Sequence, residues 1–116
     1  MSKWWSVGVL ALTLQSLGVA STVQAASLNP SQRITIAATM GSNTAKHYCG
    51  GFPLSGAIER GMMQTLVSEN LPASAMDQIN LEDKEIGIAF FENFLADSFA
   101  QCPGRARAIW RQIVEM

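Results

Sequence analysis

The two cysteines of this chain, Cys49 and Cys102, limit its possible folds more than any other feature. An even number of cysteines in an exported protein is typical of a disulfide framework. A bond between them closes a loop of 54 residues, for which chain entropy predicts a stabilisation of about 4 kcal/mol. We therefore expect a disulfide between Cys49 and Cys102 that joins segments far apart in the sequence.

Export is predicted from residues 1–25, which have the plan of a cleavable signal peptide. Lys3 precedes an apolar run from Trp4 to Leu17, and the segment Val23-Gln24-Ala25 places small residues before a cleavage site at Ala26. The alternative is an uncleaved membrane anchor, but an anchor needs about 20 apolar residues, and polar residues interrupt this run. We expect cleavage, no further membrane attachment, and an oxidising compartment such as the periplasm.

The composition of the chain is that of a globular protein, and we expect residues 26–116 to form a single small domain. The whole chain has 8 Lys and Arg against 9 Asp and Glu, a net charge of −1, so the basic excess of a nucleic-acid-binding protein is missing. Hydrophobic residues make up 48% and charged residues 15%, which argues against disorder. No repeat or low-complexity tract divides the chain.

The spacing of apolar residues predicts an all-α fold, a small four-helix bundle joined by the disulfide. The first helix has Asn29 at its N-cap and Pro30 at its first position. The alternation of apolar residues from Ile34 to Met40 favours a strand there instead, but the sequence contains no second segment that could pair with it. The sequence does not decide whether the helix is broken at Gly41. The expected helices span residues 30–48, 55–69, 81–102 and 105–115.

Two turns separate these helices at places where glycine and proline occur together. Gly50-Gly51-Phe52-Pro53 follows the first helix and Pro103-Gly104 follows the third. The disulfide requires both turns to lie at one pole of the molecule. Ser55 and Asn80 are the expected N-caps of the second and third helices, and Gly56 and Gly61 are expected to mark close helix packing.

The third expected helix carries apolar residues on two neighbouring stripes, so it should be the central one. The first stripe contains Cys102 and is therefore expected to face the core; it consists of Ile88, Phe91, Leu95, Phe99 and Cys102. The second stripe, Ile86, Phe90 and Phe94, is expected at the margin of the core. We predict that these side chains bind a protein partner or a second copy of the chain, the alternative being that all the phenylalanines fill the core.

The sequence predicts no catalytic residue, metal or cofactor. His47 is the single histidine, and with Cys49 it supplies too few ligands for a zinc site. Glu82, Asp83 and Glu85 lack the alternation and glycine of a calcium loop. An enzyme that uses His47 is the alternative, and it requires a carboxylate against the imidazole ring.

Arg105 and Arg107 lie near the start of the last expected helix, where the helix dipole disfavours positive charge. A carboxylate from residues 82–97 or an external anion is one explanation of their position. The other is a solvated surface, because exposed ion pairs contribute little to stability.

These features predict a small exported binding or accessory protein that acts by protein contact, through the phenylalanine-rich helix or the glycine-rich turn near Cys49. The plan of signal peptide, helices and one long-range disulfide is similar to that of small periplasmic acid-stress chaperones, although the charge content is lower. A chaperone-like protein is therefore one alternative. An inhibitor or immunity protein is another, with the loop from Gly50 to Ser55 as its contact surface.

Overall fold

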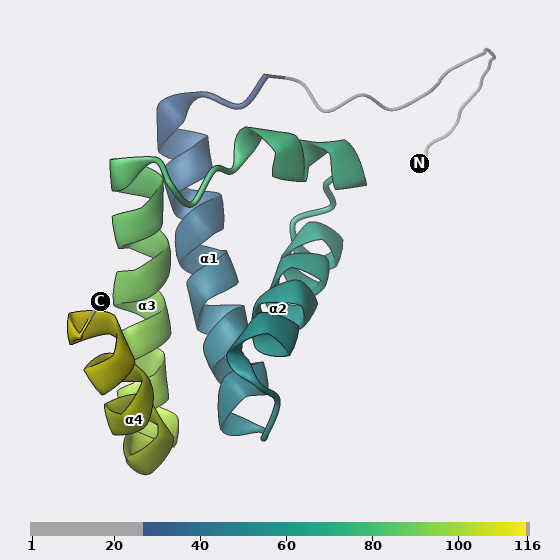
Figure 1. The fold of residues 1–116 in the computed structure, drawn as a ribbon. Coiled ribbons are helices and arrows are strands. Elements are labelled where there is room, and N and C mark those ends of the chain that lie inside the picture. Colours follow the sequence, from purple (N-terminus) through teal and green to yellow (C-terminus); the bar gives the residue numbers. More distant parts are fainter. Residues whose placement is uncertain (1–26, 116) are drawn as a thin grey trace, which may run out of the picture.

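The computed structural model describes residues 27–115, and over that range it consists of helices and their connections (Figure 1). The elements are α1 (Pro30–Cys49), α2 (Leu54–Ser68), a short 3-10 helix η1 (Ala73–Gln78), α3 (Lys84–Gln101) and α4 (Pro103–Val114). The predicted all-α class is confirmed. The predicted signal peptide, residues 1–25, lies outside the described residues. None of the helices in the described range is long and apolar enough to cross a membrane.

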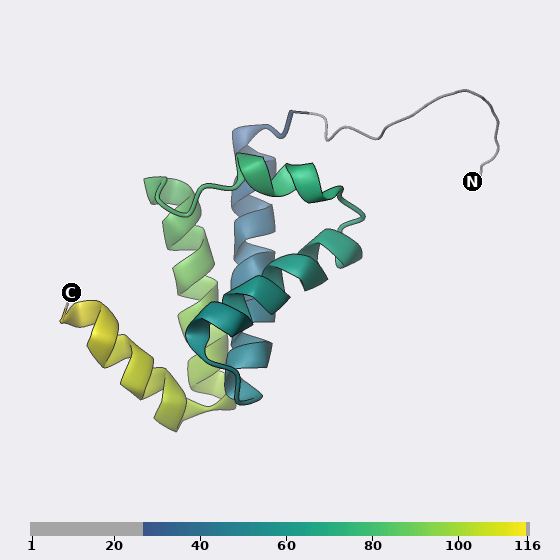
Figure 2. The same cartoon turned by 45° about the vertical axis from the view of Figure 1, so that its right-hand side comes forward.

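Helix α1 occupies the middle of the molecule, with α3 packed on one side and α2 on the other. The third main helix is therefore not the central one, contrary to the prediction. Helix α4 packs on α3 and extends away from the pole at which the two helices meet (Figure 2). The order across the molecule is α2, α1, α3 and α4.

The start of α1 has the predicted N-cap, Asn29, which forms a capping box with Gln32. Asn29 Oδ1 accepts a hydrogen bond from the backbone N–H of Gln32 at 2.8 Å, and Gln32 Oε1 accepts one from the backbone N–H of Asn29 at 2.9 Å. The helix continues through Gly41 without a break, so the strand alternative is wrong.

Gly41 and Gly61 allow the helices to approach closely. A Cβ on Gly41 would lie 2.2 Å from the carbonyl oxygen of Phe90 on α3, and a Cβ on Gly61 would lie 2.4 Å from Oγ1 of Thr44 on α1. The predicted close packing at Gly61 is confirmed. The same prediction is wrong for Gly56, because a Cβ there would have its nearest neighbouring atom, a side-chain carbon of Pro53, at the ordinary contact distance of 3.8 Å.

The predicted caps of α2 and α3 are shifted by a few residues. Helix α2 has Pro53 at its N-cap, with no side-chain hydrogen bond, and Ser55 lies inside its first turn. Helix α3 has Asp83 at its N-cap, where Oδ1 accepts a hydrogen bond from the N–H of Glu85 at 3.2 Å. Asn80 instead stabilises the preceding turn by accepting a hydrogen bond from Glu82 N–H at 3.0 Å.

The second stripe of α3, and not the first as predicted, is the more deeply buried one. Of the first stripe, Phe91, Leu95 and Cys102 pack half-buried against the core, and Phe99 is 38% exposed. Phe90 and Phe94 are 0% exposed and Ile86 is 6% exposed, whereas Ile88 is 47% exposed. The prediction that Ile86, Phe90 and Phe94 lie at the margin of the core is therefore wrong. The prediction places the first stripe in the core because Cys102 continues it. Cys102, however, follows the end of α3 and has a non-helical backbone, with φ −145° and ψ 73°, so its position does not indicate which face of the helix is buried.

Candidate functional site

The disulfide pole joins the ends of α1 and α3. The Sγ atoms of Cys49 and Cys102 lie 2.01 Å apart and their Cα atoms 5.5 Å apart, so the predicted pair is within disulfide distance. Nη2 of Arg105 donates a hydrogen bond to the carbonyl oxygen of Phe52 at 3.3 Å. The two glycine–proline turns therefore meet at one pole, as predicted.

Arg105 and Tyr48 form a reciprocal contact at this pole. The guanidinium carbon of Arg105 lies 4.1 Å from the centre of the Tyr48 ring, and Nη1 donates to the Tyr48 carbonyl oxygen. The Tyr48 hydroxyl in turn donates to the carbonyl oxygen of Arg105 at 3.1 Å. The partner of Arg105 is therefore the C-terminal end of α1, whose dipole favours a cation. The expectation of a solvated surface holds for Arg107, which is exposed, but not for Arg105, which is half-buried.

The turn after α1 has the hydrogen bonds of a Schellman motif, which places Phe52 beside His47. Gly51 has a φ of 110°, a backbone conformation that favours glycine. Its N–H donates to the carbonyl oxygen of Tyr48 at 3.1 Å, and the N–H of Phe52 donates to that of His47 at 3.2 Å. The rings of His47 and Phe52 meet edge to face, with centroids 6.1 Å apart.

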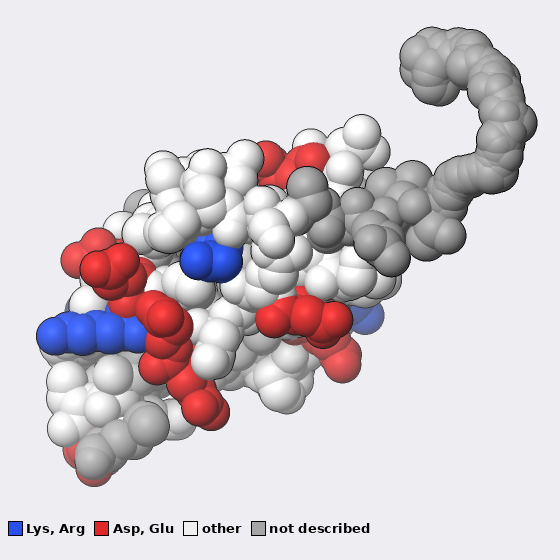
Figure 3. Space-filling model, turned by 90° about the horizontal axis from the view of Figure 1, so that it is seen from above, with Lys and Arg blue, Asp and Glu red and all other residues white. Residues whose placement is uncertain are grey.

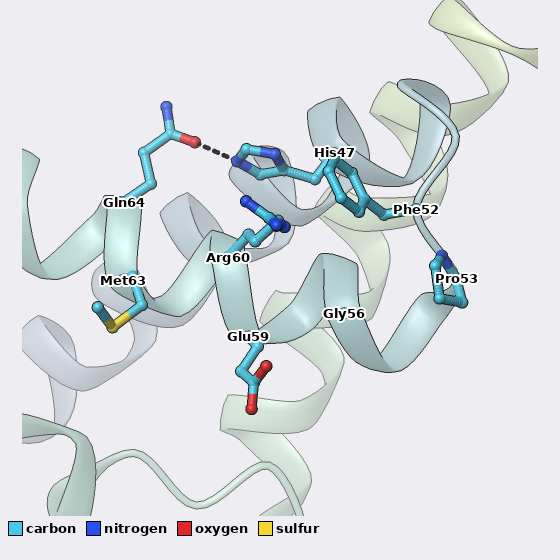
Figure 4. Close-up of a pocket in the computed structure, with 8 residues that line it drawn as sticks. All are labelled: His47, Phe52, Pro53, Gly56, Glu59, Arg60, Met63 and Gln64. Atoms are coloured by element: carbon cyan, nitrogen blue, oxygen red, sulfur yellow. Dashed lines mark hydrogen bonds between the residues drawn. The ribbon is translucent and has the colours of Figure 1, made fainter.

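An open groove of about 780 Å³ lies between this turn and α2 (Figure 4). Helix α1 contributes one lining residue, the turn contributes two, and the remainder come from α2. The lining residues are His47, Phe52, Pro53, Gly56, Glu59, Arg60, Met63 and Gln64. The contact of Gly61 with Thr44 brings this part of α2 against α1.

The polar groups of the groove are concentrated around His47 and Arg60. Nε2 of His47 and Oε1 of Gln64 are hydrogen-bonded at 2.9 Å. The guanidinium carbon of Arg60 lies 4.1 Å from the centre of the Phe52 ring, a cation–π distance. Within residues 27–115, Arg60 has no ion pair or hydrogen bond. Its charge is thus held beside His47 and is open to a ligand.

The apolar part of the groove is accessible to solvent. Phe52 is 36% exposed and Met63 is 63% exposed, and Pro53 lies next to Phe52 in the turn. The carboxylate of Glu59 points away from His47 and Arg60 in Figure 4. The groove therefore combines an apolar surface with the positive charge of one arginine, Arg60.

The geometry around His47 differs from that of a catalytic dyad. Among the described residues its ring contacts an amide and an aromatic ring but no carboxylate. The described part of the chain also contains no group of three or more His, Cys, Asp or Glu side chains that could hold a metal ion. The arrangement is suited to holding a ligand by hydrogen bonds, charge and apolar contact.

Sequence reasoning identified His47 and the loop from Gly50 to Ser55, but missed the contribution of α2. The signal for it was present, because Arg60, Met63 and Gln64 are spaced by three and four residues and so share one helix face. The predicted partner-binding residues Ile86, Phe90 and Phe94 lie in the core beneath α1 and contribute nothing to the groove.

Comparison with known proteins gives no relative from which to assign the groove. No family model matches the chain, and neither a curated protein nor a solved structure matches it.

Proposed function

We propose that the protein acts by contact, as a small binding protein that takes a segment of a partner protein into the groove between the α1–α2 turn and α2. The observation that carries this proposal is the exposure of Phe52 and Met63 on a groove that also contains the unpaired charge of Arg60. Apolar side chains around a few placed polar groups are the usual composition of a ligand site.

Contact is a better explanation of this site than catalysis by His47. A general base of that kind is normally oriented by a carboxylate, whereas His47 is hydrogen-bonded to the amide of Gln64. The exposed turn from Gly50 to Pro53 also suits the inhibitor or immunity alternative. A binding protein and an inhibitor or immunity protein would thus contact their partner through the same surface.

The proposed place of action is an oxidising compartment outside the cytoplasm. The disulfide-distance pair Cys49–Cys102 supports it, and so does the signal-peptide pattern of residues 1–25.

Selection of peptides from a displayed random library tests the proposal. The bait is the disulfide-bonded protein, and the test variant is Met63→Asp, which introduces a charge into the apolar part of the groove. The matched control is Val114→Asp on α4, because Val114 is 58% exposed and lies outside the groove.

We expect peptides enriched on the wild-type protein to bind the Val114→Asp variant equally well. They should bind the Met63→Asp variant at least about tenfold more weakly, which corresponds to the loss of a contact worth roughly 1.4 kcal/mol. Equal binding to both variants, or the absence of any enriched peptide, would contradict a peptide-binding groove.

A further inference from the structure

We infer that the ligand of the groove is an acidic peptide segment, in which a carboxylate next to an apolar side chain is bound by Arg60 near His47. This inference rests on the proposed function and adds the chemistry of the partner. The carboxylate is assigned to Arg60, and the apolar side chain to the surface made by Phe52 and Met63.

Arg60 is arranged to bind an anion. Stacking on Phe52 at 4.1 Å restricts the long side chain while leaving its N–H groups without a partner among the described residues. A guanidinium presents these donors in a planar fork that matches the two oxygens of a carboxylate. Because the side chain is already oriented, less conformational entropy is lost when the anion binds.

His47 adds a second polar group to the same region. Its ring contacts the same Phe52 ring that Arg60 covers, and it lies in the last turn of α1 together with Lys46. Figure 4 shows the imidazole and the guanidinium at one side of the groove. A carboxylate placed there meets the free donors of Arg60, with the His47 ring beside it, whose Nε2–H donates to Gln64 Oε1.

The disulfide pole carries more Lys and Arg than Asp and Glu, although the chain has a net charge of −1. The basic residues lie in the last turn of α1, the first half of α2 and the first half of α4, namely Lys46, Arg60, Arg105 and Arg107, against the carboxylates Glu59 on α2 and Asp97 near the end of α3. Figure 3 shows the opposite end of the molecule, where acidic side chains predominate. This separation of charge attracts an acidic partner to the disulfide pole.

The groove has its cation at one place only, so it disfavours ligands that carry negative charge along their whole length. Glu59 lines it, so a polyphosphate or nucleic acid lying along the groove would meet a carboxylate of the same sign. A single carboxylate can pair with Arg60 while the adjacent apolar group covers Met63. This combination favours a peptide over a phosphate-bearing ligand.

A titration followed by amide resonances in NMR tests the inference on the disulfide-bonded protein. The probes are N-acetyl-L-leucine, which has a carboxylate beside an apolar side chain, and N-acetyl-L-leucinamide, which has the same side chain but no charge. The test variant is Arg60→Gln. The matched control is Arg111→Gln, because Arg111 is an exposed arginine on α4 outside the groove.

We expect the acid to shift the resonances of groove residues and to bind about fivefold more tightly than the amide, as for one exposed charge pair worth about 1 kcal/mol. Arg60→Gln should remove this difference, Arg111→Gln should retain it, and Glu59→Gln should increase it. Equal affinity for acid and amide, or an advantage of the acid that survives Arg60→Gln, would overturn the carboxylate assignment.

The proposed function is tested separately, by peptide selection on the Met63→Asp variant. If selected peptides require Met63 but the acid has no advantage over the amide, the groove binds peptides and the inference about acidic segments is wrong. If no peptide is selected, the proposed function fails as well.

Discussion

At the scale of single residues, the absence of a side chain at Gly41 determines how closely α1 and α3 approach. A Cβ there would lie 2.2 Å from a backbone oxygen of Phe90, and backbone atoms cannot move aside as the end of a flexible side chain can. We predict that Gly41→Ala lowers the free energy of unfolding by about 1–3 kcal/mol, the usual cost of overpacking.

Chemical denaturation of the disulfide-bonded protein measures this effect, and Gly104→Ala is the control. A Cβ on Gly104 meets nothing within 4 Å, so this change should be neutral or stabilising by up to about 1 kcal/mol. An unfolding midpoint for Gly41→Ala equal to that of the wild type would show that the contact is not tight.

A second residue with a defined structural role is Arg105. Its guanidinium donates to the carbonyl oxygens of Tyr48 and Phe52 and stacks on the Tyr48 ring. We predict that Arg105→Ala costs about 1.5–3 kcal/mol, the range for hydrogen bonds to a charged group. Arg107→Ala, which changes an exposed arginine in the same helix, should change the free energy of unfolding by less than about 0.5 kcal/mol. Equal losses for the two variants would argue against a role for Arg105 at the pole.

At the scale of secondary-structure elements, the helices were predictable because their signals are local. The capping box at Asn29 and the glycine–proline turns locate the ends of α1 and α2 to within one or two residues. The buried face of α3 was not predictable in this way. It depends on which side meets Gly41 of α1, a contact between residues about 50 positions apart in the sequence.

The groove shows the same limit of local reasoning. His47 and the turn from Gly50 to Ser55 stood out in the sequence, whereas Arg60 and its neighbours on α2 did not. Their position depends on the register between α1 and α2, which follows from the contact of Gly61 with Thr44. No local pattern specifies that register.

The corrected orientation of α3 predicts opposite effects for two of its residues. Phe90→Ala should lower the free energy of unfolding by about 3–5 kcal/mol, because it removes a fully buried ring. Ile88→Ala should cost less than about 1 kcal/mol, because Ile88 is 47% exposed. Denaturant midpoints of the two variants measure the difference, and a larger loss for Ile88→Ala would restore the original assignment of faces.

At the scale of the whole molecule, the Cys49–Cys102 pair links the two helices that form the largest interface, α1 and α3. We predict that Cys49→Ser lowers the free energy of unfolding by about 2–5 kcal/mol, the usual range for a disulfide in a small exported domain. Alkylation of the folded protein without reductant should label neither cysteine. Labelling of Cys102 under those conditions would show that the bond is not formed.

The central claim is that the protein works by contact at the groove of its disulfide pole. Site-specific photo-crosslinking in the compartment of origin tests it most directly, with a photoreactive amino acid replacing either Met63 in the groove or Val114 on α4. We predict a discrete cross-linked adduct from position 63 that is lost when Arg60→Gln is added, and none from position 114. Adducts of equal yield from both positions, or no adduct from position 63, would contradict the central claim, whereas an adduct from position 63 unaffected by Arg60→Gln would contradict only the assignment of an acidic segment to Arg60.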